Sequence, residues 1–147
     1  MSSLIKHISV SLLSVILFLG AFSRFSHGKF VPWWYAFQTY HAPDDGSTVA
    51  IITPYIDLLI GLVLLFGRQS FRLAAAAISL FFFVIGLAMQ VSAGKNYMGD
   101  VALVAVGIAA VWGASTTSKE AQWPVFSGEF WVVCISGLLL QLVRALY

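Results

Sequence analysis

The stretch that decides the fold is Val49–Phe66, which reads VAIITPYIDLLIGLVLLF. This run of 18 residues contains a single charged side chain, Asp57. A helix needs about 20 predominantly apolar residues to cross the hydrocarbon core of a bilayer. Val49–Phe66 is therefore expected to be a membrane-spanning helix that carries one carboxyl group near its middle.

The composition of the whole chain agrees with this interpretation. The 147 residues are 60% hydrophobic and only 10% charged, whereas soluble domains carry about 25% charged residues. So little charge excludes a water-soluble globular domain, and so much apolar surface excludes a disordered chain. The net charge of +2 lacks the basic surface that nucleic-acid binding requires. The sequence therefore predicts a multi-pass integral membrane protein that contacts the lipid bilayer and binds no nucleic acid.

Four further apolar stretches have the composition of membrane-spanning helices, and polar or glycine-containing breaks separate them. We expect a single domain over residues 1–147. Its fold class is an all-α four-helix transmembrane bundle plus a fifth C-terminal apolar helix, with spans at about 8–24, 49–66, 73–92, 100–115 and 130–147. The first span could instead be a signal peptide, because Lys6 precedes its apolar run. Lysine and arginine divide four and four between the two sides of such a bundle, so no orientation is predicted.

The connection between the first two spans is rich in aromatic residues. Residues 24–48 hold Trp33, Trp34 and Tyr35 together with four other aromatic side chains. One interpretation is an aromatic belt at the membrane interface, where Trp and Tyr are enriched. The other is a lid across a pocket for a lipophilic molecule, since long ordered loops are often functional. In the second case Trp33, Trp34 and Tyr35 would contact the substrate.

Asp57 is the residue that says most about function. A carboxylate at bilayer depth costs at least ~2.5 kcal/mol on insertion scales, so it is expected to face the interior of the bundle. A carboxyl group held there could act as an acid, a base or a hydrogen-bond donor. Thr53 lies one helical turn away on the same face. The structural alternative is an interhelical hydrogen bond from Asp57 that only holds the bundle together.

A second polar cluster, Ser23–Lys29, follows the first span. If the helix continues through it, Gly20, Arg24 and His27 share a face. Arg24 would then suit a buried carboxylate, because its guanidinium keeps its charge and can bind both oxygens. His27 could transfer protons near neutral pH. The alternative is that Arg24 is an ordinary interfacial residue whose charged end reaches the membrane surface.

The remaining polar residues suggest supporting roles. Tyr55, Gln90 and Asn96 could orient a carbonyl, hydroxyl or quinone oxygen. Asp100 is placed to cap the helix at 100–115, and His41 looks isolated at the interface. No spacing of His, Cys or Glu suggests a metal site, and no phosphate or dinucleotide motif is present. No cofactor is therefore expected, although a quinone could be bound.

Two segments carry a resemblance to a known family. Gly20–Phe30, with its glycine, serine, histidine and lysine residues, is followed by an interfacial stretch and then by Pro54–Gly67. This pattern resembles the DoxX-like family of small membrane proteins, which has an acidic-Leu-Leu-x-Gly-Leu motif in the second span. The matching positions are Asp57, Gly61, Gly67 and Asn96. The chain departs from the family in having Asp where Glu is more common, and in its fifth apolar segment.

The resemblance implies several functions. DoxX-like proteins include subunits of quinone-linked sulfur oxidation, redox-associated membrane proteins and receptor-assembly chaperones. Similar small membrane proteins serve as cyclases or isomerases of lipophilic natural products. We expect an enzyme that performs acid–base chemistry on a terpenoid, polyketide or quinone, with Asp57, Arg24 and His27 as catalytic residues. One alternative is a non-catalytic assembly factor or redox-complex subunit, with a second copy of the chain or another membrane protein as partner. Another is a proton-linked transporter.

Overall fold

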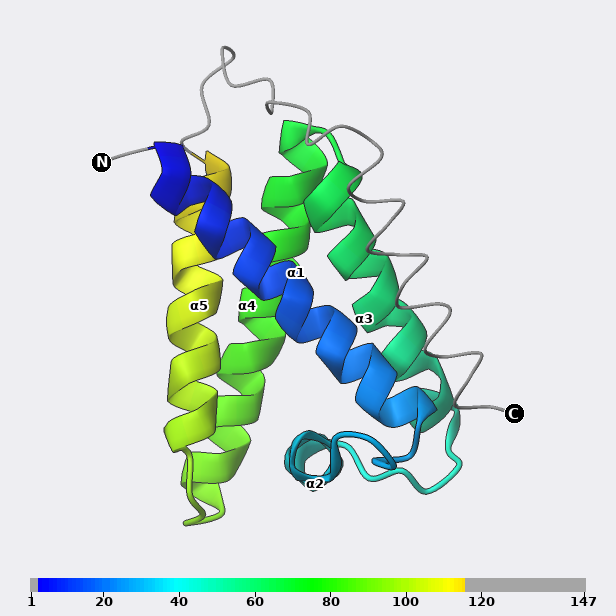
Figure 1. Cartoon of the computed structure of the whole chain (residues 1–147). Helices are drawn as coiled ribbons and strands as arrows, with labels where there is room; N and C mark the ends of the chain where they lie inside the picture. Colours follow the sequence, from blue (N-terminus) through cyan, green and yellow to red (C-terminus); the bar gives the residue numbers. More distant parts are fainter. Residues whose placement is uncertain (1–2, 116–147) are drawn as a thin grey trace. The chain divides into compact units, whose positions relative to one another are not determined.

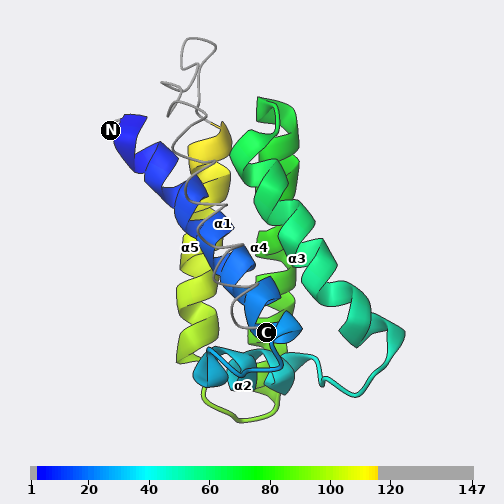
Figure 2. The same cartoon turned by 45° about the vertical axis from the view of Figure 1, so that its right-hand side comes forward.

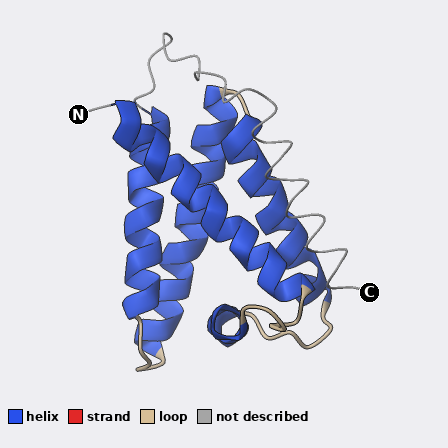
Figure 3. Cartoon of the chain, in the orientation of Figure 1, coloured by secondary structure: helices blue, strands red, loops and turns tan. Residues whose placement is uncertain are grey.

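The computed structural model describes residues 3–115, with side chains from His7 onward. Helices are the only regular secondary structure in this part of the chain, and turns and loops connect them (Figures 1 and 3). They are α1 (Ser3–Phe25), α2 (Pro32–His41), α3 (Thr48–Phe66), α4 (Gln69–Ser92) and α5 (Met98–Ser115). The fifth predicted span, at 130–147, lies outside the described residues.

Four of these helices, α1, α3, α4 and α5, are long and apolar enough to cross a membrane. The protein is thus an all-α, multi-pass integral membrane protein, as the sequence predicts. The predicted bounds of the first four spans agree with these helices within two residues except at two N-terminal ends. Helix α1 begins at Ser3 rather than at 8, and α4 begins at Gln69 rather than at 73. Polar residues extend α4 there, and Arg72 Nη2 donates a hydrogen bond to the Leu65 carbonyl at 2.9 Å. Arg72 therefore belongs to the first turn of α4 and satisfies a carbonyl at the end of α3.

The four long helices pack through small and aliphatic side chains. Helix α1 crosses the bundle diagonally against α3 and α5, and α4 lies beside α5 (Figures 1 and 2). The core is made of Val10, Leu13, Leu17, Leu64, Ala75, Ala76, Ala110 and Ala114. Small residues let membrane helices approach closely, and Gly61 is the clearest case. A Cβ atom at Gly61 would lie only 2.8 Å from the Phe18 ring, and Ser14 Oγ donates to the Gly61 carbonyl at 2.9 Å.

The aromatic segment after α1 is the short helix α2, which lies across one end of the bundle (Figures 1 and 2). It begins at Pro32, and proline is well suited to the first turn of a helix. Trp33 is 66% exposed, whereas Trp34 and Phe37 line a cavity inside the bundle. Helix α2 therefore presents one aromatic face to the surroundings and the other to the interior.

Candidate functional site

A cavity of about 460 Å³ lies among all five described helices. Small-molecule sites typically have volumes of about 300–1,000 Å³. The walls are predominantly aliphatic and aromatic, with Ile16, Phe37, Ile60, Phe83 and Leu103 among them. The size and the walls suit a lipophilic molecule.

On the side of α3 and α4 the cavity is bordered by exposed side chains. Val49, Ile56 and Phe82 line it and are 68%, 44% and 57% exposed, respectively. All three are apolar, which is compatible with contact between this side of the described helices and the hydrocarbon core of a bilayer.

Three polar groups meet at Gly20 of α1. A Cβ atom built at Gly20 would lie 2.9 Å from Gln38 Nε2, 3.3 Å from Asp57 Oδ2 and 3.8 Å from Trp34 Nε1. All four residues line the cavity. Only a residue without a side chain leaves this space open, so Gly20 permits the amide, the carboxylate and the indole to converge.

The Asp57 carboxylate has no fixed partner among the residues that the structure describes. The ion pairs found there are His27–Asp44 and His41–Asp100, and no hydrogen bond to Asp57 is present in that part of the chain. The residue is half-buried and lines the cavity. Its carboxylate is thus available to a molecule bound there.

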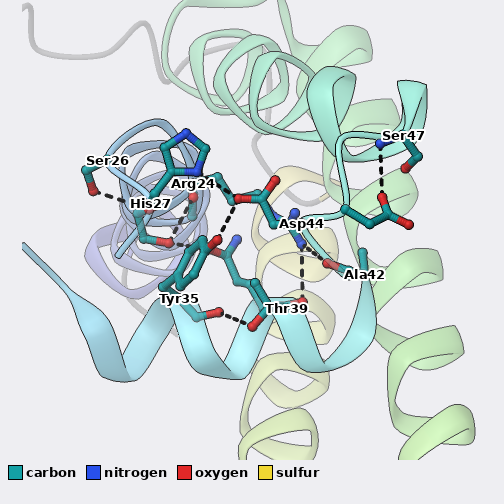
Figure 4. A network of polar contacts seen from close by, with 12 residues as sticks. Arg24, Ser26, His27, Tyr35, Thr39, Ala42, Asp44 and Ser47 are labelled. Carbon is teal, nitrogen blue, oxygen red and sulfur yellow. Dashed lines mark hydrogen bonds and ion pairs between the residues drawn. The ribbon is translucent and has the colours of Figure 1, made fainter. Parts of the chain in front are cut away.

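Arg24 does not form the expected ion pair with Asp57. Its Nη2 atom instead donates to the carbonyls of Gln38 at 3.2 Å and Ala42 at 2.9 Å, the latter seen in Figure 4. These carbonyls lie at the C-terminal end of α2, where cations are favoured by the helix dipole. The guanidinium is buried and close enough for its charge to act on Asp57. Arg24 therefore holds α2 in place and contributes positive charge to the cavity.

Gln38 was not identified from the sequence. The Ser23 hydroxyl donates to Gln38 Oε1, so the amide nitrogen of Gln38 is turned toward Gly20 and Asp57. Periodicity within α2 could have placed Gln38 on the same face as Trp34, one turn earlier. It could not have shown that this face meets α1 and α3.

His27 lies outside the cavity, and its expected position on a common face with Gly20 and Arg24 is wrong. Helix α1 ends at Phe25, and His27 has a φ of +46° in the turn that follows. Its Nδ1 atom lies 2.8 Å from Asp44 Oδ2, which also accepts a 2.6 Å hydrogen bond from Tyr35 Oη (Figure 4).

These contacts join the turn after α1, helix α2 and the connection to α3. The hydrogen bond with Asp44 raises the pKa of Tyr35. The hydrogen bonds from Tyr35 and then from His27 lower the pKa of Asp44. Tyr35 is thus part of a clamp at the end of the bundle.

A second polar cluster joins α2, α4 and α5. The Nδ1 atom of His41 lies 2.9 Å from the Phe37 carbonyl, which can only accept, so Nδ1 carries a proton. The other ring nitrogen, Nε2, lies 2.8 Å from Asp100 Oδ1 and 3.1 Å from Gln90 Nε2. A Cβ atom at Gly86 would lie 3.3 Å from the His41 ring, so this glycine makes room for it.

Two expectations about this cluster are corrected. His41 is not isolated at the interface, because α2 folds back and brings its imidazole to the cavity. Asp100 was expected to cap the helix that begins near it. It lies in the first turn of α5, is 2% exposed and pairs with His41. Gln90 does not line the cavity itself but contacts His41, which does.

Of the other predicted substrate-binding residues, one lines the cavity and two lie outside it. Thr53 lines the cavity, although its hydroxyl donates to the Val49 carbonyl at 2.7 Å. Tyr55 is 58% exposed and packs against the Phe25 ring outside the cavity. Asn96 is exposed in the connection before α5, where its Oδ1 accepts from the Met98 N–H at 3.1 Å. The predicted residues that line the cavity are thus Arg24, Trp34, Thr53 and Asp57.

No group of three His, Cys, Asp or Glu side chains that could hold a metal ion occurs within residues 3–115. Comparison of the chain with protein-family models, with curated proteins and with solved structures finds no match. The resemblance to the DoxX-like family therefore stays a prediction. What the geometry defines is a class, a helical membrane protein with an apolar cavity and polar groups at its wall.

Proposed function

We propose that the protein is a small membrane enzyme that binds a lipophilic molecule in its cavity and transfers protons on it. Asp57 is the acid or base. The observation that carries this proposal is the Asp57 carboxylate, which lines an apolar cavity without a hydrogen-bond or ion-pair partner in the described part of the chain. Isomerisation or cyclisation of a terpenoid, polyketide or quinone would need no cofactor.

A purely structural role for Asp57 fits this arrangement poorly. Polar groups removed from water are nearly always hydrogen-bonded, because leaving them unpaired is costly. A carboxylate that served only to hold α3 against its neighbours would be expected to bind one of them. Asp57 instead faces Gly20 and the open volume of the cavity. This position is typical of a side chain that contacts a ligand.

The remaining residues support the same chemistry. Arg24 places a permanent positive charge near Asp57 and would stabilise negative charge that develops on a bound molecule. Thr53 and the apolar walls would orient the hydrophobic body of that molecule. His27 is assigned no catalytic role in this proposal, because it lies outside the cavity.

The experiment uses the full chain in lipid nanodiscs, incubated in D₂O with a lipid extract of the native cells. Mass spectrometry measures which lipophilic molecules gain deuterium. We expect Asp57→Asn, which keeps the shape of the side chain, to lower the rate of incorporation by about 10²–10⁴-fold, the usual contribution of a general acid or base. Asp45→Asn, in the exposed connection before α3, is the matched control and should leave the rate unchanged.

Two results would contradict the proposal. One is the absence of any incorporation by the wild-type protein, and the other is equal incorporation by the Asp57→Asn variant. If Asp57→Asn instead abolishes co-purification with another membrane protein, the protein is an assembly factor or a subunit of a larger complex.

A further inference from the structure

We infer that the substrate carries a carbonyl group, whose oxygen is bound by Gln38 Nε2 and Trp34 Nε1 while Asp57 removes a proton from the adjacent carbon. This inference rests on the proposed function and names its substrate class. The atoms that carry it are the three that converge on Gly20. They belong to two N–H donors and one carboxylate, and they come from α2 and α3.

Gln38 supplies the first hydrogen-bond donor. Because the Ser23 hydroxyl donates to Gln38 Oε1, the amide oxygen is already used and the two N–H groups of Nε2 are left for a ligand. Nε2 lies 2.9 Å from the position of a Gly20 Cβ. Gln38 is therefore held as a donor before any ligand arrives.

Trp34 supplies the second donor. Its indole Nε1 is buried and has no hydrogen-bond partner within residues 3–115. An indole N–H can only donate, and a buried donor without an acceptor costs about 1–3 kcal/mol. An acceptor oxygen on a bound molecule, beside Gly20, would remove that cost.

At the Gly20 position the nearest charged group, Asp57, favours a neutral carbonyl compound over a fatty acid. A carboxylate head group at Gly20 would lie beside Asp57 Oδ2, which is 3.3 Å from the Cβ position, and like charges so close repel. A ketone, aldehyde or ester avoids this repulsion. Its oxygen accepts from Gln38 and Trp34, and its α-carbon lies on the side of Asp57.

The chemical step is a proton transfer that balances within one molecule. The Asp57 carboxylate takes a proton from the α-carbon, the C–H electron pair forms a carbon–carbon double bond, and the carbonyl π pair moves onto oxygen. The two N–H donors and the charge of Arg24 stabilise this enolate. The protonated Asp57 then returns its proton to the γ-carbon of a β,γ-unsaturated substrate, which gives the conjugated isomer.

The test uses a medium-chain β,γ-unsaturated ketone as the probe, with the matched alcohol and carboxylic acid. Full-length protein in phosphatidylcholine nanodiscs is incubated with each in D₂O. We measure deuterium at the α-carbon and at the γ-carbon, the ultraviolet absorbance of the conjugated ketone and the shift of the bound C=O infrared band. We expect exchange and a shifted band with the ketone, and no exchange with the alcohol or the acid.

Three variants test the donors. Gln38→Met removes one donor and keeps the length of the side chain, and Trp34→Phe removes the other and keeps an aromatic ring. Each should lower the exchange rate by about 10²–10³-fold and reduce the band shift. Gly20→Ala places a Cβ against the flexible end of Gln38 and should give a similar loss in a protein that still folds. The control is Tyr40→Phe, because Tyr40 of the same helix is 52% exposed and does not line the cavity; it should leave the rate unchanged.

Exchange of the ketone at the wild-type rate by Gln38→Met, Trp34→Phe and Gly20→Ala would overturn the inference. So would Asp57-dependent deuterium incorporation confined to lipids that lack a carbonyl group, which would leave the proposed function standing. If the wild-type protein exchanges neither the ketone nor any lipid of the extract, both proposals fail.

Discussion

His41 of α2 and Asp100 of α5 are joined inside the bundle by a contact of 2.8 Å between Nε2 and Oδ1. The carboxylate is almost fully buried, and its second oxygen has no partner within the described residues. This pair connects the end of the interfacial helix to a membrane-spanning helix. It is therefore expected to fix where α2 lies.

The Asp100→Asn variant should loosen α2. The asparagine amide makes a weaker contact with the imidazole than the carboxyl group does, so we expect a loss of about 1–3 kcal/mol in the free energy of unfolding and faster amide exchange in α2. Unfolding in detergent micelles and hydrogen exchange measured by mass spectrometry would check this. Tyr97→Phe, at an exposed position nearby, is the control. An Asp100→Asn variant that is as stable as the wild type, with amides of α2 as well protected from exchange, would disprove the role of the pair.

Arg24→Lys should selectively weaken the C-terminal end of α2. A lysine carries the charge, but its ammonium ends one bond short of the guanidinium Nη2 atom, which donates to the carbonyls of both Gln38 and Ala42. Hydrogen bonds from charged groups contribute about 1.5–3 kcal/mol, and we expect a loss of this order. Protection of the amides at the end of α2 should fall while that of α5 is kept. Uniform loss of protection over the whole bundle would argue against a capping role.

The clamp at Asp44 should open in acid. Hydrogen bonds from Tyr35 and His27 lower the pKa of Asp44 below its ordinary value of 3.8. The ionised carboxylate therefore stabilises the folded clamp at pH values above 3.8, and this contribution is lost as the pH falls through the lower pKa of the folded state. Cleavage of the connection at 42–47 by pepsin should rise over that range.

Two variants separate this titration from general acid unfolding. Asp44→Asn should be cleaved at a rate that changes little over the same range, because it has no carboxyl group to protonate. Tyr35→Phe removes the largest cause of the lowered pKa, so cleavage should begin to rise closer to pH 3.8. Identical profiles for all three proteins would show that Asp44 does not control the clamp.

Gly61→Ala should disturb the contact between α1 and α3. The added methyl group would lie 2.8 Å from the Phe18 ring, and overpacking of this kind typically costs about 1–3 kcal/mol. The neighbouring Leu62 is 38% exposed, so Leu62→Met should have little effect. Unfolding in micelles would measure both. Equal stability of the two variants would mean that Phe18 moves aside without cost.

The fold and part of the site could be predicted because single side chains carry strong signals in a membrane protein. An apolar run of sufficient length predicts a spanning helix, and the one carboxylate within the run at 49–66 predicts a functional group. Gln38 and His41 escaped prediction because nothing in the periodicity of α2 shows that it folds back across the bundle. The capping role of Arg24 could not be predicted either, because its acceptors are backbone carbonyls, which every residue has.

The exposed apolar border of the cavity between α3 and α4 has a consequence for how occupancy must be measured. We expect a ligand to reach Asp57 across this border from the bilayer, so its mole fraction in lipid, rather than its aqueous solubility, would set the degree of saturation. Adding inert phospholipid at a constant total amount of ligand would then dilute it and lower the observed rate. Apparent constants from different preparations become comparable only when each is expressed per mole of lipid.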